Sequence, residues 1–523
     1  MNMEDKIESQ ELQESETTIG SESDYCPESD LLSTQSDFSQ SQKSDCTDSN
    51  MKYIVFESCL DKLIRFCPDC GAPVTETSKL VVGTQINIKI SCHNGHTSIW
   101  HSQPMVHKMP AGNLLISAAI LFSGNTFTHI ENLCKLFQLQ FISHTTYNDI
   151  QQEILFPTIN AAYLENQQNV HSYLSGKPLM VSGDGRCDSP GYSAKYQTYT
   201  IMDQETNLIL DFTQVQVTQA GNSNAMEKLA CQQTLDKLLA SYLQINTFAT
   251  DRHIQIRSMM KTNYSSINHQ FDIFHVCKNL KKKLIKISNQ SGCGDIASWI
   301  KSICNHLWWS CASSEGDVKM VREKWLSLIH HISNCHIFLC NDIYTQCAHD
   351  ELSPEVERSR KWLMAGSSAH TALMKVVTHK TLVADLQQMT SFCHTGDLEV
   401  YHSLLLKYCP KRLNFSFPGM LARTQLAILD HNNNCERSQA TTADGQLRFN
   451  IKFTKQSKSW IAKPIAQHKN NNWAIDLMNS VILVKTKVML ATNPDIPELP
   501  KNIATLPQPP KDELITQMTS RFR

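Results

Sequence analysis

Apolar and polar positions alternate between strand-like and helix-like periods over residues 177–288. Three apolar runs come first, and each has the length and composition of a β-strand: residues 178–184, 199–202 and 208–217. The polar stretch 203–207 between the second and third runs predicts a hairpin turn. Helical spacing of Met and Leu residues then begins at an N-cap, either Asn222 or Ser223. The pattern therefore predicts three consecutive strands and one helix.

The same region continues with two further strand–helix pairs. Residues 245–250 predict a buried strand that ends at Asp251, and a short helix with apolar residues over 254–259 follows. A further strand is predicted over 269–275, and a lysine-rich helix comes after it. This order of elements is that of the ribonuclease-H-like fold, an α/β core with a mixed sheet flanked by helices.

Two aspartates, Asp184 and Asp251, follow the first and fourth predicted strands. These strands are neighbours in a ribonuclease-H-like sheet, so we expect the two carboxylates to meet. Carboxylates a few ångströms apart repel one another unless a cation lies between them, and their oxygens suit Mg²⁺ or Mn²⁺. Two such ions can activate a water and stabilise the leaving oxygen of a phosphodiester. A single aspartate at a strand end is more often a turn residue or a helix cap.

Composition divides the rest of the chain. We expect a disordered acidic Ser-rich head (1–50), a zinc-ribbon-like segment (62–105), a helical region (112–176), the first part of the core (177–290), an all-α insertion domain (291–392), the completion of the core (393–465) and a tail (466–523).

Charge is distributed unevenly along the 523 residues. The first 50 residues hold 13 acidic and two basic side chains, so the remaining 473 carry a net charge of +9 although the whole chain has −2. An acidic head before a basic body weakly indicates an anionic partner. No run of about 18 apolar residues predicts a membrane span, and the acidic start does not have the pattern of a secretory signal. We therefore interpret the 19 cysteines as thiols or metal ligands in a reducing compartment.

A zinc-binding pattern lies near the start of the globular sequence. Cys67 and Cys70 form a CxxC pair, and after 21 residues Cys92 and His96 form a CxxxH pair. Two close pairs on the turns of a hairpin supply the four tetrahedral ligands that Zn²⁺ requires. His93 and His101 are alternatives for the fourth ligand. Buried free thiols with an exposed histidine are the structural alternative.

A second group of histidines and cysteines lies in the predicted insertion domain. Its members are the candidate ligands of a second zinc: His331, His336, Cys347 and His349. Histidines on an amphipathic helix are more often ordinary surface or core residues, and this alternative stays open.

Basic side chains accompany the predicted carboxylates. The residues that we expect to contact DNA phosphates are Arg186, Arg252, Lys278, Lys281, Lys282 and Lys283. Such contacts give affinity that depends on salt without reading the base sequence. A lysine-rich helix face is otherwise most often simply solvated.

Four segments together resemble DDE transposases of the Kolobok superfamily and host proteins derived from them. They are Ser182–Gly191, Ala249–Arg257, Phe271–His275 and His394–Tyr408. With the upstream Cys/His segment, the resemblance covers about residues 65–465. It implies Mg²⁺-dependent DNA hydrolysis and strand transfer, DNA as partner and the nucleus as compartment. It implies no small-molecule organic cofactor and leaves self-association open.

The resemblance also implies roles for individual residues. Asp184, Asp251 and a late acid would hold Mg²⁺, and Glu399 matches the late acid best. Asp397 is the alternative, and because it lies about 200° from Glu399 around a helix only one of them can face the ions. Asp272 and His275 match a C/D-x-x-H motif that would orient or shield the site. The 147 residues between Asp251 and Glu399 imply the insertion domain.

The sequence departs from the family in one respect. No upstream DNA-binding module such as a THAP-type finger is recognisable before Cys67. We therefore keep two alternatives to an active transposase: a catalytically silent, domesticated nuclear protein that binds DNA or chromatin, and a ribonuclease-H-like nuclease without strand transfer.

Overall fold

The computed structural model describes most of the chain after the acidic head. Described are residues 51–190, 194–338, 343–454, 459–489, 492–500, 506–507 and 509–518. The predicted head, residues 1–50, lies outside the described residues. The chain divides into two compact units, the first made of Met1–Asn169, Glu399–Pro410 and Pro418–Pro494, and the second of Val170–Leu398, Lys411–Phe417 and Asp495–Arg523.

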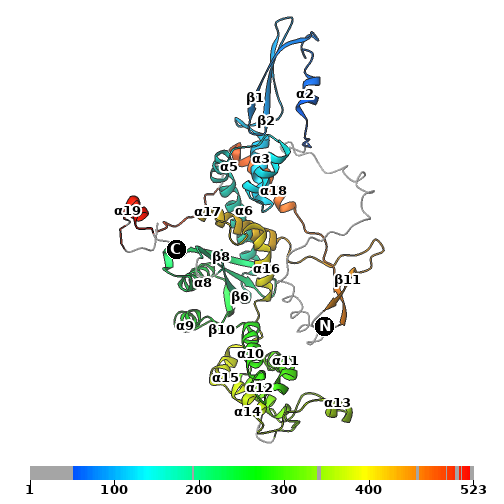
Figure 1. Cartoon of the computed structure of the whole chain (residues 1–523), viewed down its shortest axis with the longest axis vertical. Coiled ribbons are helices and arrows are strands. Elements are labelled where there is room, and N and C mark those ends of the chain that lie inside the picture. The colour runs from blue at the N-terminus through cyan, green and yellow to red at the C-terminus, as the bar shows by residue number, and fades with distance from the viewer. Residues whose placement is uncertain are drawn as a thin grey trace. The chain divides into compact units, whose positions relative to one another are not determined.

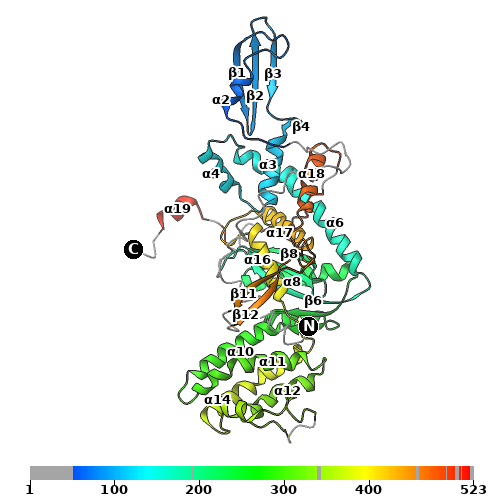
Figure 2. The same cartoon turned by 90° about the vertical axis from the view of Figure 1, so that its right-hand side faces the viewer.

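A three-stranded antiparallel sheet begins the first unit. Its strands are β1 (Val74–Val82), β2 (Gln85–Cys92) and β3 (Thr97–His101), and the short helix α2 (Glu57–Leu63) precedes them. β2 lies in the middle (Figure 2). Most side chains of β1 are exposed, whereas Ile88 and Ile90 of β2 are buried. The sheet thus has little core of its own and depends on its turns for stability.

Helices make up most of the first unit. After the small hairpin of β4 (Met105–Val106) and β5 (Met109–Pro110), the chain forms α3 (Ala111–Phe122), α4 (Phe127–Phe137), α5 (His144–Ile150), a π-helical turn η1 (Gln151–Leu155) and α6 (Phe156–Leu174). These helices agree with the helical region predicted over 112–176. Two further helices come later in the chain, α16 (Gly396–Tyr408) and α17 (Phe417–Asn432).

The segment expected to be a tail contains regular structure. The hairpin of β11 (Phe449–Thr454) and β12 (Ser459–Pro464) precedes it, and the helix α18 (Asn472–Lys485) lies within it. α18 packs against α3 and buries Leu477 and Val481. Residues 472–485 therefore belong to the folded first unit, and the short helix α19 (Lys511–Thr516) follows later.

A five-stranded mixed sheet organises the second unit. Its strands are β6 (Pro178–Cys187), β7 (Tyr196–Asp203), β8 (Ile209–Gln216), β9 (Gln244–Thr250) and β10 (Asn268–Phe271), in the order β10-β9-β6-β7-β8. β6, β7 and β8 are antiparallel to one another, and β9 and β10 run parallel to β6. The first and fourth strands are therefore neighbours, as the sequence predicted.

Both faces of the sheet are covered at β7 and β8, because every residue of these two strands is buried. α8 (Ser223–Ala240) packs against these two strands, and the sequence fixes where it begins: the Asn222 side chain accepts the backbone N–H of Ala225. The predicted turn over 203–207 is present, with Asp203 accepting the Thr206 N–H. Figure 1 shows α8 and α9 (Ile254–Asn263) beside the sheet.

The strand predicted over 269–275 is too long. β10 stops at Phe271 because the Asp272 side chain accepts the Phe274 N–H at 2.9 Å and so caps α10 (Ile273–Ser288). His275 therefore lies in the first turn of α10 and not in the sheet.

Residues after α10 are helical, as expected for 291–392. The elements are η2 (Gly294–Trp299), α11 (Ile300–Ala312), α12 (Val318–His331), α13 (Pro354–Ser359), α14 (Ser368–Val377), α15 (Lys380–Asp385) and η3 (Leu386–Gln388). α10, α11, α12 and α14 pack together (Figures 1 and 2). Trp325 of α12 is fully buried. Among the described residues, no helix has the length and apolar content of a membrane span.

Candidate functional site

Asp184 and Asp251 occupy equivalent positions on two neighbouring parallel strands. The pairing of β6 with β9 ends at Gly183 and Thr250, so each aspartate is the next residue along its strand. β6 itself continues to Cys187 beside β7, so Asp184 lies within β6 and not at its end as predicted. Burial raises the pKa of Asp251, and the charge of Asp184 raises it further while His275 lowers it. The two carboxylates thus interact electrostatically.

A third carboxylate, Glu227 of α8, belongs to the same cluster, and the sequence interpretation missed it. Burial raises the pKa of Glu227 to about 7, and the charges of Asp184 and Asp251 raise it further, whereas a hydrogen bond with Gln197 lowers it. A Cβ atom placed on Gly185 would lie 3.1 Å from the Glu227 Cγ, so the side chain passes close over β6. The three carboxylates therefore interact electrostatically, and each charge disfavours ionisation of its neighbours.

The spacing of the buried residues along α8 indicates which way Glu227 faces. Buried residues of α8 recur at Cys231, Thr234 and Leu238, which lie four, seven and eleven positions after Glu227. An acid at the head of this stripe faces the sheet and not the solvent.

His275 connects two of the predicted site residues. Its Nδ1 lies 2.8 Å from the Asp251 Oδ1 and 2.7 Å from the Asp272 Oδ2. Burial lowers the pKa of His275, but both carboxylates raise it, to about 11 overall, so the ring is an imidazolium here. Asp251, Asp272 and His275 also offer ligand atoms within 4.8 Å of one another, as a metal site would.

Asp272 has a positioning role. Its carboxylate is buried and accepts the Phe274 N–H, the Thr395 hydroxyl at 2.6 Å and the His275 ring. With these donors on its two oxygens, it orients His275 and fixes the start of α10. The role that the resemblance implies for Asp272 and His275, to orient or shield the catalytic site, stays a prediction.

Both candidates for the late acid, Asp397 and Glu399, lie in the first turn of α16. Asp397 belongs to the second unit, with the aspartates of the sheet, whereas Glu399 is assigned to the first. Both stay candidates for the late acid.

The first Cys/His group comes together as predicted. Ligand atoms of Cys67, Cys70, Cys92 and His96 all lie within 4.8 Å of one another, and the Cys70 and Cys92 sulfurs are 3.8 Å apart. Gly71 and Gly95 have φ of +69° and +82°, so glycine suits the two turns that bend the chain around the group. His101 instead pairs with Asn87, so His96 is the fourth member. This Cys₃His cluster could hold a metal ion.

The second Cys/His group also assembles. His331, His336, Cys347 and His349 offer ligand atoms within 4.8 Å of one another.

The predicted DNA-contacting residues divide into two sets. Lys278, Lys281, Lys282 and Lys283 are exposed on α10, as a phosphate-binding surface requires. Arg186 is buried, with 6% of its surface exposed, and Arg252 forms an ion pair of 2.7 Å with the buried Asp385. Arg186 is therefore enclosed by the fold, whereas Arg252 is exposed, and for both residues the contact with DNA stays a prediction.

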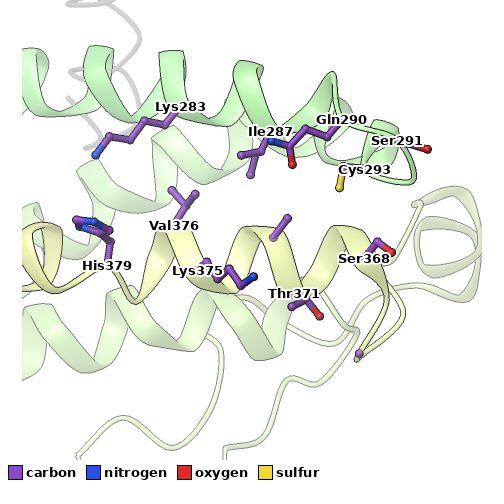
Figure 3. A pocket seen from close by; sticks show the side chains of 12 residues that line it. Lys283, Ile287, Gln290, Ser291, Cys293, Ser368, Thr371, Lys375, Val376 and His379 are labelled. Atoms are coloured by element: carbon purple, nitrogen blue, oxygen red, sulfur yellow. The ribbon is translucent and has the colours of Figure 1, made fainter.

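A pocket of about 650 Å³ lies between α10 and α14 (Figure 3). Lys283, Lys375 and His379 contribute polar groups, and Ile287 and Val376 contribute apolar ones. Among the described residues that line the pocket there is no aspartate or glutamate. The pocket is thus distinct from the carboxylate cluster.

Comparisons with known proteins leave the family open. No family model matches the chain, and no curated protein matches it. Among solved structures it is similar to one described as "Drosophila P element transposase strand transfer complex", with a TM-score of 0.26 and 9% identity over 63% of this chain and 93% of that one. A TM-score this low carries no argument about fold or activity, so the functional conclusion depends on the residues of this chain.

Proposed function

We propose that the chain is a metal-dependent enzyme that cleaves DNA phosphodiesters and transfers strands, built on a ribonuclease-H-like core. One observation carries the proposal: Asp184 and Asp251 directly follow the last paired residues of two adjacent parallel strands. Strand order β10-β9-β6-β7-β8 supports it, because it joins the first and fourth strands at the centre of the sheet.

Oxygen ligands in this cluster suit Mg²⁺ or Mn²⁺. Asp184 and Asp251 would hold the ions, with Glu227 and the late acid, Glu399 or Asp397, as further ligands. Ions bound there supply an activated water and stabilise the leaving oxygen. In cleavage an O–P bond forms from water and the P–O3′ bond breaks, which frees a 3′-OH. In strand transfer that 3′-OH forms the new O–P bond while a P–O3′ bond of the target DNA breaks.

Other residues of the chain prepare this chemistry. His275 orients Asp251 through its Nδ1, and Asp272 holds His275. The exposed lysines of α10 would bind the phosphate backbone and bring DNA to the cluster. The Kolobok resemblance assigns the same chemistry to these positions, and with it a nuclear location and a DNA partner.

Zn²⁺ is the metal proposed for the Cys₃His cluster, because three thiolates and one imidazole are a structural zinc ligand set. There it would hold the turns of a sheet that buries few side chains, since most of β1 is exposed. A Cys67→Ser/Cys70→Ser variant should lose this metal.

A second candidate function is a silent DNA-binding scaffold. The ion pair between His275 and Asp251 favours it, because an imidazolium already neutralises one of the carboxylates.

Supercoiled plasmid and a candidate element end separate the two functions. We expect the full chain to nick plasmid in Mg²⁺ or Mn²⁺ and to join a 3′-OH end to target DNA. Asp184→Asn and Asp251→Asn should each abolish both reactions while DNA binding persists. Glu205→Gln, a change at an exposed acid of the β7–β8 turn, is the matched control and should retain activity.

Three other outcomes decide between the alternatives. Binding without metal-dependent nicking would establish the silent scaffold. Nicking without strand transfer would identify a plain nuclease. Nicking that survives in both aspartate variants would exclude this site.

A further inference from the structure

Three histidines and a cysteine gather where α12 ends, outside the carboxylate cluster. His331 is the last residue of α12, and the other three members, His336, Cys347 and His349, lie on the segment that follows. All four offer ligand atoms within 4.8 Å of one another.

Backbone hydrogen bonds join residues 336–338 to residues 345–347. The Cys347 N–H donates to the His336 carbonyl at 2.9 Å, and the Phe338 N–H donates to the Thr345 carbonyl at 2.6 Å. A β-bridge joins Ile337 and Gln346 between them. His336 and Cys347 are thus held opposite one another, next to the end of a helix.

Distances around the sulfur fit a tetrahedral ion. The Nδ1 atoms of His331 and His336 lie 3.4 and 3.5 Å from the Cys347 Sγ. Bonds of about 2.0 Å to nitrogen and 2.3 Å to sulfur at a tetrahedral angle give a nitrogen–sulfur separation of about 3.6 Å. One ion bound to a Cys347 thiolate and to both Nδ1 atoms accounts for the two distances.

Hydrogen-bond partners outside the group of four orient the His336 and His349 rings. The His336 Nε2 lies 3.0 Å from the Asn334 Oδ1, and the His349 Nδ1 lies 2.7 Å from the Asp350 carbonyl. Metal-bound histidines commonly donate their second ring N–H to such an oxygen, which fixes the tautomer and turns the other nitrogen toward the ion. In His349 this leaves Nε2 as the ligand atom.

Two indole rings border the group. Trp362 lies 5.9 Å from His331 and 5.7 Å from His336, and Trp299 lies 6.0 Å from His331, between ring centroids. An apolar border limits the access of water and strengthens binding of an ion.

We infer that these residues form a CysHis₃ zinc site that is independent of the Cys₃His cluster. Four protein ligands leave no open position, so the site is structural. It ties His336, Cys347 and His349 to the end of α12.

Metal analysis of the purified full chain tests the inference. We expect about two zinc ions per chain in the wild type and about one in Cys67→Ser/Cys70→Ser. Cys347→Ser/His336→Gln should also hold about one, and the combination of all four changes should hold none. Co²⁺ in place of zinc should give the absorption of a tetrahedral ion with a thiolate ligand in Cys67→Ser/Cys70→Ser.

Cys335→Ser/His330→Gln is the matched control, because it changes the same residue types beside the cluster without touching its four members. It should retain both ions. A Cys67→Ser/Cys70→Ser protein without zinc and without the Co²⁺ spectrum overturns the inference, and this measurement decides even where Cys347→Ser/His336→Gln does not fold. Full zinc content in folded Cys347→Ser/His336→Gln overturns it equally.

Discussion

Asp184 and Asp251 are each the first residue after the paired stretch of two adjacent parallel strands, following Gly183 and Thr250. Their positions are set by backbone pairing and not by a flexible loop. The charge of Asp184 raises the pKa of Asp251, and both charges raise the pKa of Glu227. Repulsion between these carboxylates destabilises the folded chain, and a divalent cation bound between them would offset that cost.

Glu227→Gln tests whether the carboxylate of α8 belongs to the functional cluster. We expect metal-dependent nicking to fall by about 10- to 100-fold, because one ligand or proton acceptor is lost while the shape is kept. Rates of plasmid nicking at saturating Mg²⁺ provide the measurement. Nicking at the wild-type rate would show that Glu227 is only a buried acid.

The same variant should be more stable than the wild type at high pH in magnesium-free buffer. The Glu227 pKa is raised from 4.5 to about 7 in the folded chain, so the folded state binds the extra proton. Its contribution to stability is therefore present below about pH 4.5 and is lost as the pH rises toward 7, by at most about 3 kcal/mol. Urea unfolding at pH 6 and pH 8 should show the advantage of Glu227→Gln growing with pH. An advantage that is independent of pH would contradict the raised pKa.

Gly183→Ala should destabilise the core beside Asp184. A Cβ atom at this position would lie 2.7 Å from the Phe248 ring and 2.8 Å from the Tyr199 ring, both of them buried. Overpacking of this kind costs about 1–3 kcal/mol of unfolding free energy. Gly294→Ala is the matched control, because a Cβ there meets no atom within 4 Å. Equal unfolding free energies for the two variants would contradict the packing around Gly183.

Replacing Lys278, Lys281, Lys282 and Lys283 by Gln should weaken DNA binding for all sequences alike. Each lost phosphate contact reduces the slope of log K against log salt by about 0.9. Binding titrations at several salt concentrations measure that slope, and Lys319→Gln on α12 is the control for an exposed lysine elsewhere. An unchanged slope would show that this face of α10 is only solvated.

His306 should make the helical region of the second unit sensitive to acid. Burial lowers its pKa to about 4, although hydrogen bonds to the backbone at Lys324 and Trp325 oppose the shift. Between pH 6.5 and 4 the unfolded chain binds a proton that the folded chain does not, so stability falls as the pH falls, by about 1.4 kcal/mol per pH unit. His306→Gln should therefore lose less stability than the wild type between pH 7 and pH 5. Equal losses in the two proteins would contradict a neutral buried His306.

The strand order could be predicted from the sequence because apolar runs and polar turns alternate clearly over residues 177–288. Turn chemistry contributed too, since Asp203 and Asn222 act as the pattern indicated. The predicted end of β10 was wrong because Phe271–His275 has strand-like composition, whereas the Asp272 side chain caps a helix there.

Other features depend on tertiary packing that a single sequence does not display. In the sequence, Glu227 is not distinguished from other helix residues, because the packing of α8 on the sheet is not visible there. The ion pair of Arg252 with Asp385, 133 residues later, could likewise not be predicted from the sequence. Prolines and asparagines surround α18, and such a composition is typical of a tail. Its apolar residues nevertheless pack against α3.

Binding of Mn²⁺ to the zinc-loaded chain, followed by electron paramagnetic resonance, tests the central claim most directly. The account predicts a Mn²⁺ site in the wild type that is lost or weakened at least about 10-fold by Asp184→Asn and by Asp251→Asn alike, because both supply ligands to the same ion. Glu205→Gln should leave it unchanged. Wild-type Mn²⁺ binding in either aspartate variant would contradict a shared metal site.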